Sequence, residues 1–557
     1  MAEPEPVAPS RDELLYLPLG GVGEIGMNLS LYGWQSRWLM VDLGVTFGDA
    51  STPGIDLVVP DPRFITERLD TLDGLVLTHA HEDHLGAVPY LWRRLRCPIY
   101  ATPFSAAVLR DKLGEAGLRH EVDVVEIPSG GRFSVGPFDV EYVPVSHSIP
   151  EAHSLAIRTP VGLVVHTGDW KLDPDPVIGA TTDEATFWRL GEEGVLAMVG
   201  DSTNVVVEGE SGSEGAVRES LIGLLDECRG KIFVTLFASN IARVATIAAA
   251  AEAAGRRAVL VGMSLERYSA AARETGHLTD DVEFLDPDKA EGMASDELLY
   301  LCTGCQGEPR AAMARIVDGG RNGIRIEPGD TVVFSSKVIP GNERAIGRLH
   351  SEIMRQGAHL LTSRDHFVHV SGHPCREEVR KMYGWLRPEI AVPVHGEDRH
   401  LDSHAALAEE LGVPQIARVN NGDLVRLAPG PAEVLETVFS GRLFVDGRLM
   451  LEADDSVLRA RRRLMHDGAV MVTVMLDASG RLIGRPQIAA PGVFDQVSDG
   501  DDIEALRDAI TKDVANLPKC KRGDDKALTE RLRRTVRGRV RELRGKRPLI
   551  DVHVERA

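Results

Sequence analysis

The chain has 557 residues, 43% of them apolar, which is enough for two to four domains with buried cores. No stretch approaches the roughly 18 uninterrupted apolar residues of a membrane-spanning helix, and six cysteines in so long a chain argue against a disulfide framework. The net charge of −21 argues against a nucleic-acid partner, but residues 501–557 carry 16 Lys and Arg against 11 Asp and Glu, and a local basic patch can still bind a polyanion.

Two features near the start of the chain exclude common interpretations. Residues 1–12 are acidic and proline-rich and lack the basic and apolar regions of a signal peptide, which predicts a flexible tail on a cytoplasmic protein. Gly21, Gly23 and Gly26 match a dinucleotide-binding fingerprint, but that fingerprint needs a helix directly after the glycines. Residues 28–44 instead read as strand, turn and strand, so no nicotinamide or flavin cofactor is expected.

The segment "HAHEDH" carries the strongest chemical signal in the sequence. It contains His79, His81, Asp83 and His84, between a buried-strand pattern and a helix with an apolar stripe. So many polar groups could not be satisfied in an apolar core. His79 and His81 point the same way on an extended strand end, whereas Asp83 and His84 lie past the bend. The layout predicts two adjacent metal ions, and imidazole with carboxylate favours zinc, manganese or iron over calcium.

Two later strand ends supply further candidate ligands. His147 follows one strand pattern, and Asp169 follows another, where its carboxylate could bridge two ions. Either residue alone is more often a turn or cap residue, but the ordered series is far more specific. His153 and His166 are competing candidates, and His166 lies inside a strand, where a structural role or a place behind the ligands is expected.

Residues 216–365 alternate between strand and helix patterns, which predicts a mainly parallel sheet covered by helices. This block separates Asp169 from the next candidate ligand, His395, which follows an apolar strand. A large insertion is therefore expected between two ligands of one site. Cys302 and Cys305 within the block are only weak evidence for a separate zinc site, because no second pair accompanies them.

The ligand series resembles the metallo-β-lactamase fold superfamily, with Asp42 as its first acid. An α/β insertion in that fold is typical of the β-CASP group, whose extra motifs match "GDSTN" with Asp201, "HVSGH" from His369 to His373, and "VHGE". Roughly from residue 13 to 430 the chain resembles the ribonuclease J family, although Cys305 stands where that family usually has serine. The resemblance implies that the glycine loop lines the floor of the active site, where Asn28 either faces substrate or caps a turn.

The resemblance implies an α/β fold, in which an αββα metallo-β-lactamase sandwich carries an inserted α/β β-CASP domain. Residues 465–557 read as a strand hairpin, two helices and a strand, hence a small C-terminal α+β domain. Its basic helix, residues 528–547, could contact RNA, but a solvated helix face explains it equally well. The expected parts are a tail (1–12), the first part of the metallo-β-lactamase domain (13–215), the β-CASP domain (216–365), the second part of the metallo-β-lactamase domain (366–450), a linker (451–464) and the C-terminal domain (465–557).

The resemblance also implies roles for individual residues. One metal ion would be held by His79, His81 and His147, and the other by Asp83, His84 and His395, with Asp169 bridging both. The expected catalytic residues are Asp83, Asp201, which orients a ligand, and His373, which protonates or stabilises the leaving oxygen. RNA phosphates near the 5′ end would contact Ser239, Asn240, His369, Val370, Ser371, Gly372 and His373. From the residues alone, an N-cap role for Ser239 and Asn240 and loop-capping roles for His369 and His373 stay open.

The implied function is a metal-dependent ribonuclease with 5′→3′ exonuclease activity that prefers a 5′-monophosphate, and with endonuclease activity, in messenger decay and ribosomal RNA maturation. The implied cofactors are two divalent ions, zinc in preference to manganese or magnesium, and the implied partners are RNA and further copies of the chain in a homodimer or homotetramer. One alternative is a hydrolase of small thioesters or lactones, which would need neither the large insertion nor "HVSGH". Another is an RNA-binding scaffold without activity, against which the complete ligand series argues.

Overall fold

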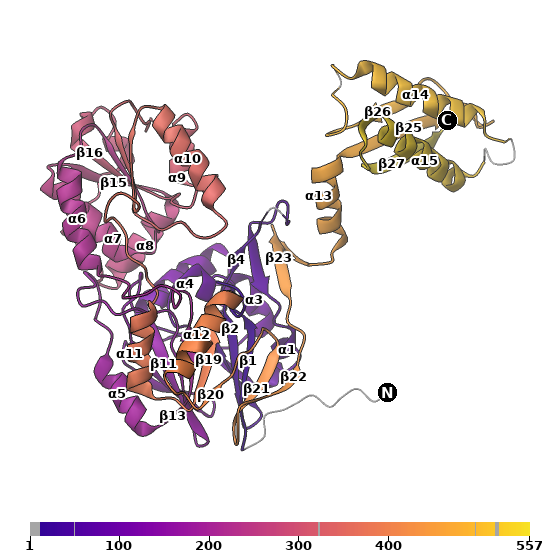
Figure 1. Cartoon of the computed structure of the whole chain (residues 1–557). Coiled ribbons are helices and arrows are strands. Elements are labelled where there is room, and N and C mark those ends of the chain that lie inside the picture. Colours follow the sequence, from indigo (N-terminus) through magenta and orange to yellow (C-terminus); the bar gives the residue numbers. More distant parts are fainter. Residues whose placement is uncertain (1–11, 50, 321–322, 496, 519–522) are drawn as a thin grey trace. The chain divides into compact units, whose positions relative to one another are not determined.

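The computed structural model describes residues 12–49, 51–320, 323–495, 497–518 and 523–557 (Figure 1). It consists of two compact units: Met1–Thr46 with Val59–Gly441, and Phe47–Val58 with Arg442–Ala557. Of the tail predicted for residues 1–12, only Asp12 lies within the described residues. In the described ranges, no helix combines the length and the apolar character needed to cross a membrane.

Two sheets pack face to face in the larger unit. The first has the strand order β22 (Glu433–Thr437), β21 (Asp423–Ala428), β1 (Leu14–Gly20), β2 (Leu29–Trp34), β3 (Arg37–Val41), β6 (Leu72–Val76), β7 (Ile99–Ala101) and β8 (Val124–Glu126). The second has the order β20 (Gln415–Ile416), β19 (Ile390–Val394), β13 (Val195–Asp201), β12 (Gly162–His166), β11 (His153–Thr159), β10 (Phe138–Pro144) and β9 (Arg132–Val135). One buried cluster joins side chains of both sheets, including Tyr32, Val76, Val164 and Val392.

Helices cover the two outer faces of this pair of sheets. On the first sheet, α4 (Pro103–Glu115) packs against β7 and β8. On the second, α12 (Asp398–Glu410) packs against β19 and α5 (Glu184–Glu193) against β13, with α11 (Arg376–Leu386) beside α5. The shorter helices α1 (Arg63–Thr66) and α3 (Val88–Leu95) contact each other. The layers therefore run helix, sheet, sheet, helix, which confirms the predicted αββα sandwich (Figure 1).

The glycine loop lies between β1 and β2, and no helix follows it. Strands β2 and β3 pair antiparallel, so the predicted strand, turn and strand are confirmed. Gly21 and Gly26 have φ values of +86° and +98°, a region that side chains with a Cβ rarely adopt. The Gly21 carbonyl accepts a 2.7 Å hydrogen bond from the backbone N–H of His395. The loop thus runs directly beside a predicted metal ligand.

The inserted part of the larger unit is built around a five-stranded sheet in which all neighbours are parallel. Its order is β15 (Arg257–Val261), β16 (Leu298–Cys302), β14 (Ile232–Thr235), β17 (Thr331–Phe334) and β18 (His359–Thr362). One face packs against α6 (Glu214–Asp226) and α7 (Ile241–Ala253), and the other against α9 (Ala312–Val317) and α10 (Glu343–Arg355). The predicted parallel sheet with covering helices is confirmed. A further helix, α8 (Met263–Glu274), packs on α4 of the sandwich.

Among the described residues, the smaller unit contains strands of two sheets, and three helices. A four-stranded sheet has the order β24 (Leu449–Glu452), β23 (Arg442–Asp446), β5 (Leu57–Pro60) and β4 (Thr46–Phe47), and α13 spans Ser456–Asp467. A three-stranded sheet has the order β26 (Gln487–Ala489), β25 (Ala469–Leu476) and β27 (Leu549–Arg556), with α14 (Gly500–Ala515) and α15 (Asp525–Arg544). These elements agree with the hairpin, two helices and final strand predicted from the sequence.

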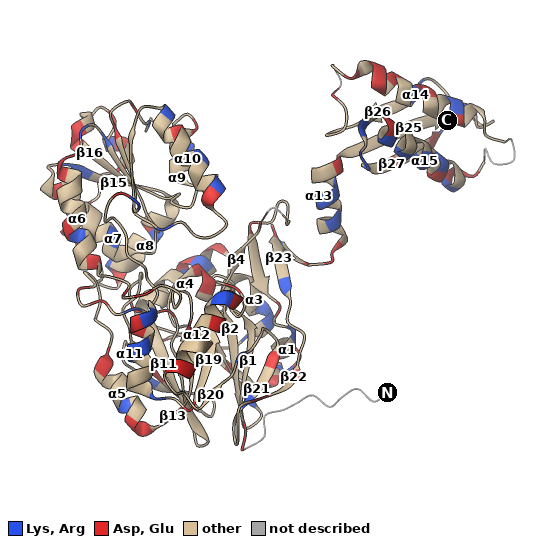
Figure 2. Cartoon of the chain, in the orientation of Figure 1, with Lys and Arg blue, Asp and Glu red and all other residues tan. Residues whose placement is uncertain are grey.

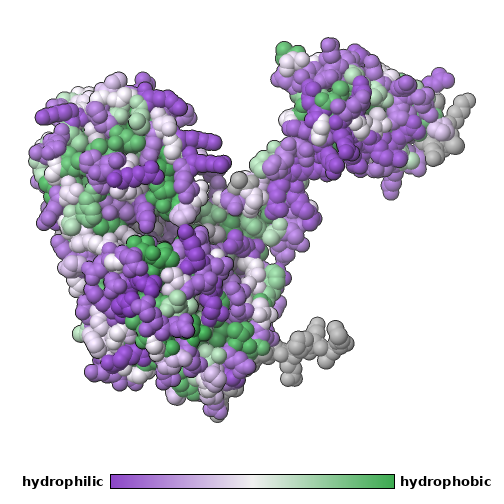
Figure 3. Space-filling model, in the orientation of Figure 1, coloured by the Kyte–Doolittle hydropathy of each residue, from purple (hydrophilic) through white to green (hydrophobic). Residues whose placement is uncertain are grey.

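Helix α15 shows how its sequence divides into two faces. Leu528, Leu532, Val536 and Val540 recur every four residues and are buried in the core of the smaller unit. The remaining positions are rich in arginine, which Figure 2 shows as blue segments along the helix. The visible face of this unit is mostly hydrophilic in Figure 3. Several of these arginines pair with acids of the same unit, as Arg531 does with Asp513, so part of the basic face is neutralised locally.

Candidate metal centre

The predicted ligands lie where strands of the two packed sheets end. His79 follows β6, His81 immediately precedes the short helix α2 (Glu82–Leu85), and that helix carries Asp83 and His84. The other three ligands follow strands of the second sheet: His147 after β10, Asp169 after β12 and His395 after β19. Asp201, predicted to orient a ligand, lies at the end of β13. His395 has a φ of +52°, and backbone strain of this kind at a non-glycine residue is concentrated at functional sites.

Three histidines and one carboxylate form the first group. The Nδ1 atom of His81 lies 3.0 Å from Nε2 of His79 and 3.0 Å from Nε2 of His147. Asp169 Oδ2 lies 3.8 Å from the His79 nitrogen and 3.7 Å from the His147 nitrogen. Four potential ligand atoms therefore converge on one point, as a tetrahedral ion would require.

A second group shares Asp169 with the first. His84 Nε2 lies 3.3 Å from Asp169 Oδ2 and 3.6 Å from Asp83 Oδ2. His395 completes it, with Nε2 at 3.3 Å from Asp83 Oδ2 and Nδ1 at 3.6 Å from Asp169 Oδ1. Asp169 thus stands between the two groups, which together contain all seven predicted ligands.

Asp201 and His373 lie at the edge of the second group. His373 Nδ1 makes a 2.8 Å hydrogen bond with Asp201 Oδ2, and the rings of His373 and His395 stack with centroids 5.5 Å apart. The other Asp201 oxygen lies 3.5 Å from His395 Nδ1. Burial disfavours the protonated His373 ring, but Asp201 and Asp169 outweigh it and raise its pKa.

Hydrogen bonds at the far side of three rings determine which nitrogen faces inward. His147 Nδ1 contacts the Gly372 carbonyl and His84 Nδ1 contacts Asp42 Oδ2, and both partners are acceptors. Thr78 gives its own proton to Asp42, so its oxygen accepts from His79 Nδ1 at 3.0 Å. In its neutral form each of these rings therefore carries its proton on Nδ1 and turns the lone pair of Nε2 into the cluster.

Converging lone pairs repel one another unless a cation lies between them. Asp169 also favours a cation at this point, because its carboxylate is 2% exposed and its Oδ1 atom has no hydrogen bond in the described structure. A buried carboxylate oxygen without a partner is costly in a protein interior. The outward-facing nitrogens, bound to a carboxylate, a carbonyl and a hydroxyl, have the arrangement typical of metal-binding histidines. The residues present therefore fit a bound metal.

The protonation of the rings agrees with this fit. Burial lowers the pKa of His79 and His147 well below the ordinary histidine range and that of His81 to about 4, so these rings are neutral. Neutral imidazole is the form that binds a metal. Burial also disfavours charge on His84, but Asp169 and two neighbouring carboxylates outweigh it and raise its pKa. An excess of negative charge thus surrounds this ring, and a cation would offset it.

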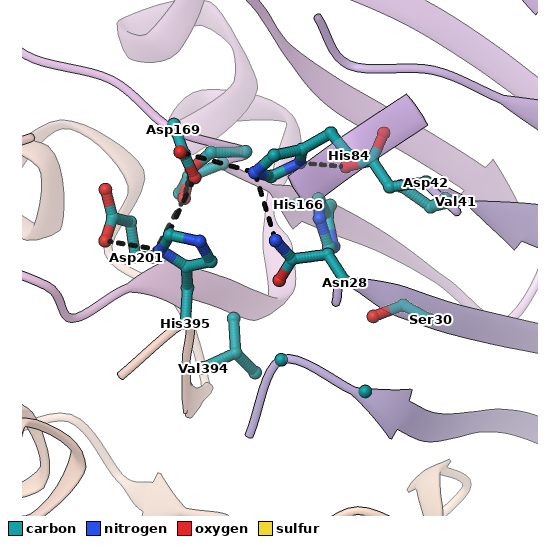
Figure 4. Close-up of a pocket in the computed structure, with 14 residues that line it drawn as sticks. Asn28, Ser30, Val41, Asp42, His84, His166, Asp169, Asp201, Val394 and His395 are labelled. Carbon is teal, nitrogen blue, oxygen red and sulfur yellow. Dashed lines mark hydrogen bonds and ion pairs between the residues drawn. The ribbon is translucent and has the colours of Figure 1, made fainter. Parts of the chain in front are cut away.

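Figure 4 shows a small cavity beside the second group, where Asp169, Asp201 and His395 face His84 and Asn28. Its volume is about 20 Å³, which is room for a water-sized occupant. The Asn28 amide donates to the Asp83 carbonyl at 3.0 Å, and its nitrogen lies 3.1 Å from His84 Nε2. The glycine loop thus reaches the cavity through Gly20, Gly21 and Asn28.

The competing candidates are held elsewhere. His153 bonds Ser129 through Nε2 at 2.8 Å and its Nδ1 contacts the Glu151 carbonyl. His166 bonds the Tyr32 hydroxyl at 2.9 Å from inside β12, although it also lines the cavity. Cys302 and Cys305 are buried, and in the described part of the chain the groups able to hold an ion contain only histidine and aspartate.

The predicted substrate residues occupy two neighbouring segments. Asn240 caps α7 by accepting from Arg243 N at 2.9 Å, so its N-cap role is confirmed. Ser239 Oγ lies 3.1 Å from His81 Nε2. In the second segment, His369, Val370, Ser371, Gly372 and His373 precede α11. His369 Nδ1 is buried without a hydrogen bond among the described atoms, and burial with the nearby Arg243 lowers the His369 pKa to about 3.

Several residues at this site were not expected from the sequence. Thr78 supports His79, and Thr203 Oγ1 lies 2.8 Å from His395 Nδ1. Asn204 donates to Ser371, which ties the "GDSTN" segment to "HVSGH". Thr78 directly precedes His79, and Thr203 is part of the "GDSTN" motif. A hydroxyl residue next to a predicted ligand or motif acid was therefore the sequence feature that could have indicated both supporting roles.

Four stretches of the chain match known families. They are a Beta-lactamase superfamily domain over residues 40–190, a Ribonuclease J, beta-CASP domain over 229–353, a Zn-dependent metallo-hydrolase RNA specificity domain over 360–418, and a Ribonuclease J C-terminal domain over 456–557. A ribonuclease J of Sinorhizobium meliloti is 44% identical over 98% of this chain and 97% of that protein. The chain belongs to the ribonuclease J family. The predicted metallo-β-lactamase fold with its β-CASP insertion and C-terminal domain is thereby confirmed.

Other members of the ribonuclease J family are similar over nearly the same extent. Ribonuclease J of Mycolicibacterium smegmatis is 38% identical over 99% of this chain and 98% of that protein, and ribonuclease J 1 of Streptococcus pyogenes is 36% identical over 88% of each. The crystal structure of a protein of unknown function from Enterococcus faecalis V583 covers 74% of this chain and 100% of that one, with a TM-score of 0.52 and 16% identity, which shows a shared fold. Family membership and the histidine–aspartate groups together support metal binding.

Proposed function

We propose that the protein is a metal-dependent ribonuclease that hydrolyses phosphodiester bonds at two divalent ions. The observation that carries the proposal is Asp169, a buried carboxylate shared by two groups of ligands, with one oxygen left without a hydrogen bond in the described structure. In this assignment the first ion would be held by His79, His81 and His147, and the second by Asp83, His84 and His395. Zinc fits the nitrogen-rich first group best, whereas manganese or magnesium suits oxygen-rich groups.

Bound ions would lower the pKa of a coordinated water and offset negative charge on the scissile phosphate. The chain's own groups do the rest. Asp201 accepts from His373 Nδ1, which leaves Nε2 of that ring to give a proton to the leaving oxygen. Asp201 also holds the ring orientation, so it acts as a positioning residue. Asp83, between His84 and His395, keeps negative charge at the second group.

The substrate side of the proposal rests on small residues and positive charge. The segment 369–373 presents Ser371 and Gly372, which let a phosphate backbone approach closely. Arg243, Lys337 and Lys171 all lower the His369 pKa. Arg243 is paired with Glu214 and Lys171 with Asp173, so we assign the attraction for a phosphate to Lys337. A terminal 5′-phosphate held there would set a fixed distance to the metal ions and favour removal of one nucleotide at a time from the 5′ end.

The test is cleavage of matched RNAs with 5′-monophosphate and 5′-triphosphate ends, in Mn²⁺ or Mg²⁺. We expect mononucleotides from the monophosphate RNA, less product from the triphosphate RNA, and no product after chelation or in Asp83→Ala. Products cut internally from both RNAs at equal rates would refute the 5′-end preference but keep the nuclease. Intact RNA together with hydrolysis of a thioester would refute the proposal itself.

The RNA specificity match and the family support RNA binding, whereas the small-molecule hydrolase is not favoured. We extend the proposal to messenger decay and ribosomal RNA maturation, and to a homodimer or homotetramer in solution. Light scattering of the full chain checks the oligomer. Sequencing of RNA 5′ ends after depletion of the protein checks the cellular substrates, and unchanged 5′ ends would contradict those roles.

A further inference from the structure

The inserted domain contacts the histidine loop of the sandwich at two points. Ser239, directly before the cap of α7, places its hydroxyl 3.1 Å from His81 Nε2. Tyr268 of α8 donates from its hydroxyl to the carbonyl of Ala80 at 3.2 Å. Ala80 is the residue between His79 and His81, so both contacts act on the segment that carries two predicted ligands of the first ion.

Both contacts come from well-fixed positions. Ser239 is followed by Asn240, which caps α7 and contacts Glu214 through its amide. Tyr268 is 7% exposed, and burial raises its pKa well above the ordinary value, so its hydroxyl keeps the proton that it donates. Helix α8 is held on α4 through an ion pair between Arg267 and Glu115. Both hydroxyl groups therefore come from residues that other contacts of the inserted domain hold in place.

His81 differs from the other histidines of its group in what supports it. The outward nitrogens of His79 and His147 are bound by Thr78 and by Gly372, both outside the five-stranded inserted domain. His81 instead turns Nδ1 inward, 3.0 Å from both neighbouring rings, and its outward Nε2 meets Ser239. A group that bonds the outward nitrogen fixes the tautomer and the ring orientation of a metal-binding histidine.

We propose that the inserted domain takes part in metal binding, with Ser239 and Tyr268 as positioning residues that orient His81 and its loop. Through these two contacts with the sandwich, the inserted domain sets the affinity of the three-histidine group for its ion. Ser239 acts through His81, which distinguishes this role from a direct contact with RNA. The inference depends on metal binding at this group and not on RNA cleavage.

The experiment measures Zn²⁺ and Mn²⁺ affinity of the full chain without RNA, by competition with a chromogenic chelator. Ser239→Ala removes the partner of His81, and we expect it to weaken metal binding by about ten- to a hundred-fold. Ser239→Thr keeps the hydroxyl and should restore most of the affinity. Tyr268→Phe removes only the bond to Ala80 and should weaken binding in the same direction. In the Co²⁺-loaded protein, Ser239→Ala should also change the visible absorption spectrum.

The matched control is Ser269→Ala, a change of the same kind on α8. Ser269 is 4% exposed and its hydroxyl has no hydrogen-bond partner in the described structure, so its removal should leave the metal affinity unchanged. Equal weakening in Ser269→Ala would mean general loosening of the domain and would overturn the proposal. Wild-type affinity in Ser239→Ala would overturn it too. If that variant keeps its metal but shows a raised KM for RNA, Ser239 contacts only substrate.

This outcome can be separated from failure of the nuclease assignment. Metal affinity is measured without RNA, so a wild-type protein that binds metal but leaves RNA intact refutes the proposed function alone. Chemical denaturation in the presence of chelator checks that each variant folds without help from the ion. A variant that unfolds early in chelator is replaced by Ser239→Gly, which must lose affinity as Ser239→Ala does if the hydroxyl is responsible.

Discussion

Two buried polar clusters meet the chain near the start of α7. Arg243 of α7 belongs to one of them, and Ser239, just before the helix, contacts a histidine of the other. Arg243 is fully buried and gives its protons to Glu214 at 2.8 Å, to Ser335 and to the Val368 carbonyl at 2.8 Å. Each charged group in that cluster has its ion-pair or hydrogen-bond partners within the chain. The histidine cluster that meets Ser239 instead turns lone pairs inward and leaves an Asp169 oxygen without a hydrogen bond in the described structure.

The difference between the two clusters distinguishes a structural role from a ligand-binding role. A buried charge with all partners inside the chain fixes one packing arrangement, and no ligand is needed to explain it. A buried cluster whose atoms repel each other gains stability from an added ligand, and lone pairs with carboxylates suit a cation. The Glu214–Arg243 pair therefore indicates how the inserted domain is held, and the Asp169 cluster indicates where chemistry takes place.

The largest expected effect comes from removing the charge of Asp169 while keeping its shape. Asp169→Asn replaces the shared carboxylate by an amide whose N–H groups can bond the inward nitrogens. We expect loss of bound metal and a fall in RNA cleavage of about ten-thousand-fold, or about 5.5 kcal/mol. Elemental analysis and single-turnover cleavage measure the two effects. Asp280→Asn, on the exposed surface, should change neither. An Asp169→Asn protein that keeps its metal would remove the distinction between the clusters.

The next effect tests the cluster that is complete without a ligand. Arg243→Met leaves Glu214 as an uncompensated buried charge and should lower the free energy of unfolding by about 3–5 kcal/mol. The double change Glu214→Leu with Arg243→Met removes both charges and should recover most of that loss. Chemical denaturation in the presence of chelator measures the stability of each variant without any contribution from a bound ion. If the double variant is no more stable than Arg243→Met, the pair is not a self-contained unit.

Removal of the metal should have a smaller effect on stability. An ion at a hundred-fold excess over its dissociation constant stabilises the folded chain by about 2.7 kcal/mol, because the unfolded chain lacks the assembled site. Chelation should therefore lower the unfolding temperature of the wild-type protein, and added Zn²⁺ should restore it. The Asp169→Asn variant provides the control, since a chelator has nothing to remove from it. A chelator effect of equal size in that variant would place the stabilising ion elsewhere.

The comparison also explains how much could be predicted. Strand and helix patterns are local, so the parallel sheet of the inserted domain and the placement of ligands at strand ends followed from periodicity. The structure brings the seven predicted metal ligands together in two groups. Four of them were recognised as closely spaced histidines and aspartate, and the other three as polar residues after predicted strands and through the family resemblance. The residues that bond the outward nitrogens of the predicted ligands were not predicted from the sequence. Ser239 meets His81 across 158 residues and Gly372 meets His147 across 225, and only the tertiary fold brings such pairs together.

A similar limit applied to the short strand β5, which is part of the sheet formed with β23 and β24 of the smaller unit. Strand β5 contains only four residues, so its partners cannot be inferred from alternation. Among the expectations that stay predictions are the domain limits and the substrate contacts of 369–373. They depend on how chain segments meet RNA and metal rather than on how the segments fold.

The smallest expected effect is a pH dependence that arises in a third cluster, where all partners are again within the chain. His404 is fully buried, with Ser202 Oγ at 2.8 Å from Nδ1 and the Tyr383 hydroxyl at 2.9 Å from Nε2. Burial lowers the pKa of His404 to about 4, whereas the unfolded chain has the ordinary value near 6.5. The unfolded state therefore gains a proton first as pH falls, and stability is lost between those two values.

This single histidine should cost about 1.4 kcal/mol of stability between about pH 8 and about pH 5.5. His404→Gln keeps polar atoms at the site but cannot titrate, so the drop in unfolding free energy over that interval should shrink by about that amount. His553→Gln is the matched control, because it is the same substitution at a histidine that is 60% exposed. Equal pH slopes in wild type and His404→Gln would show that the folded protein accommodates the charge, and that a cluster complete in hydrogen bonds can still admit a cation.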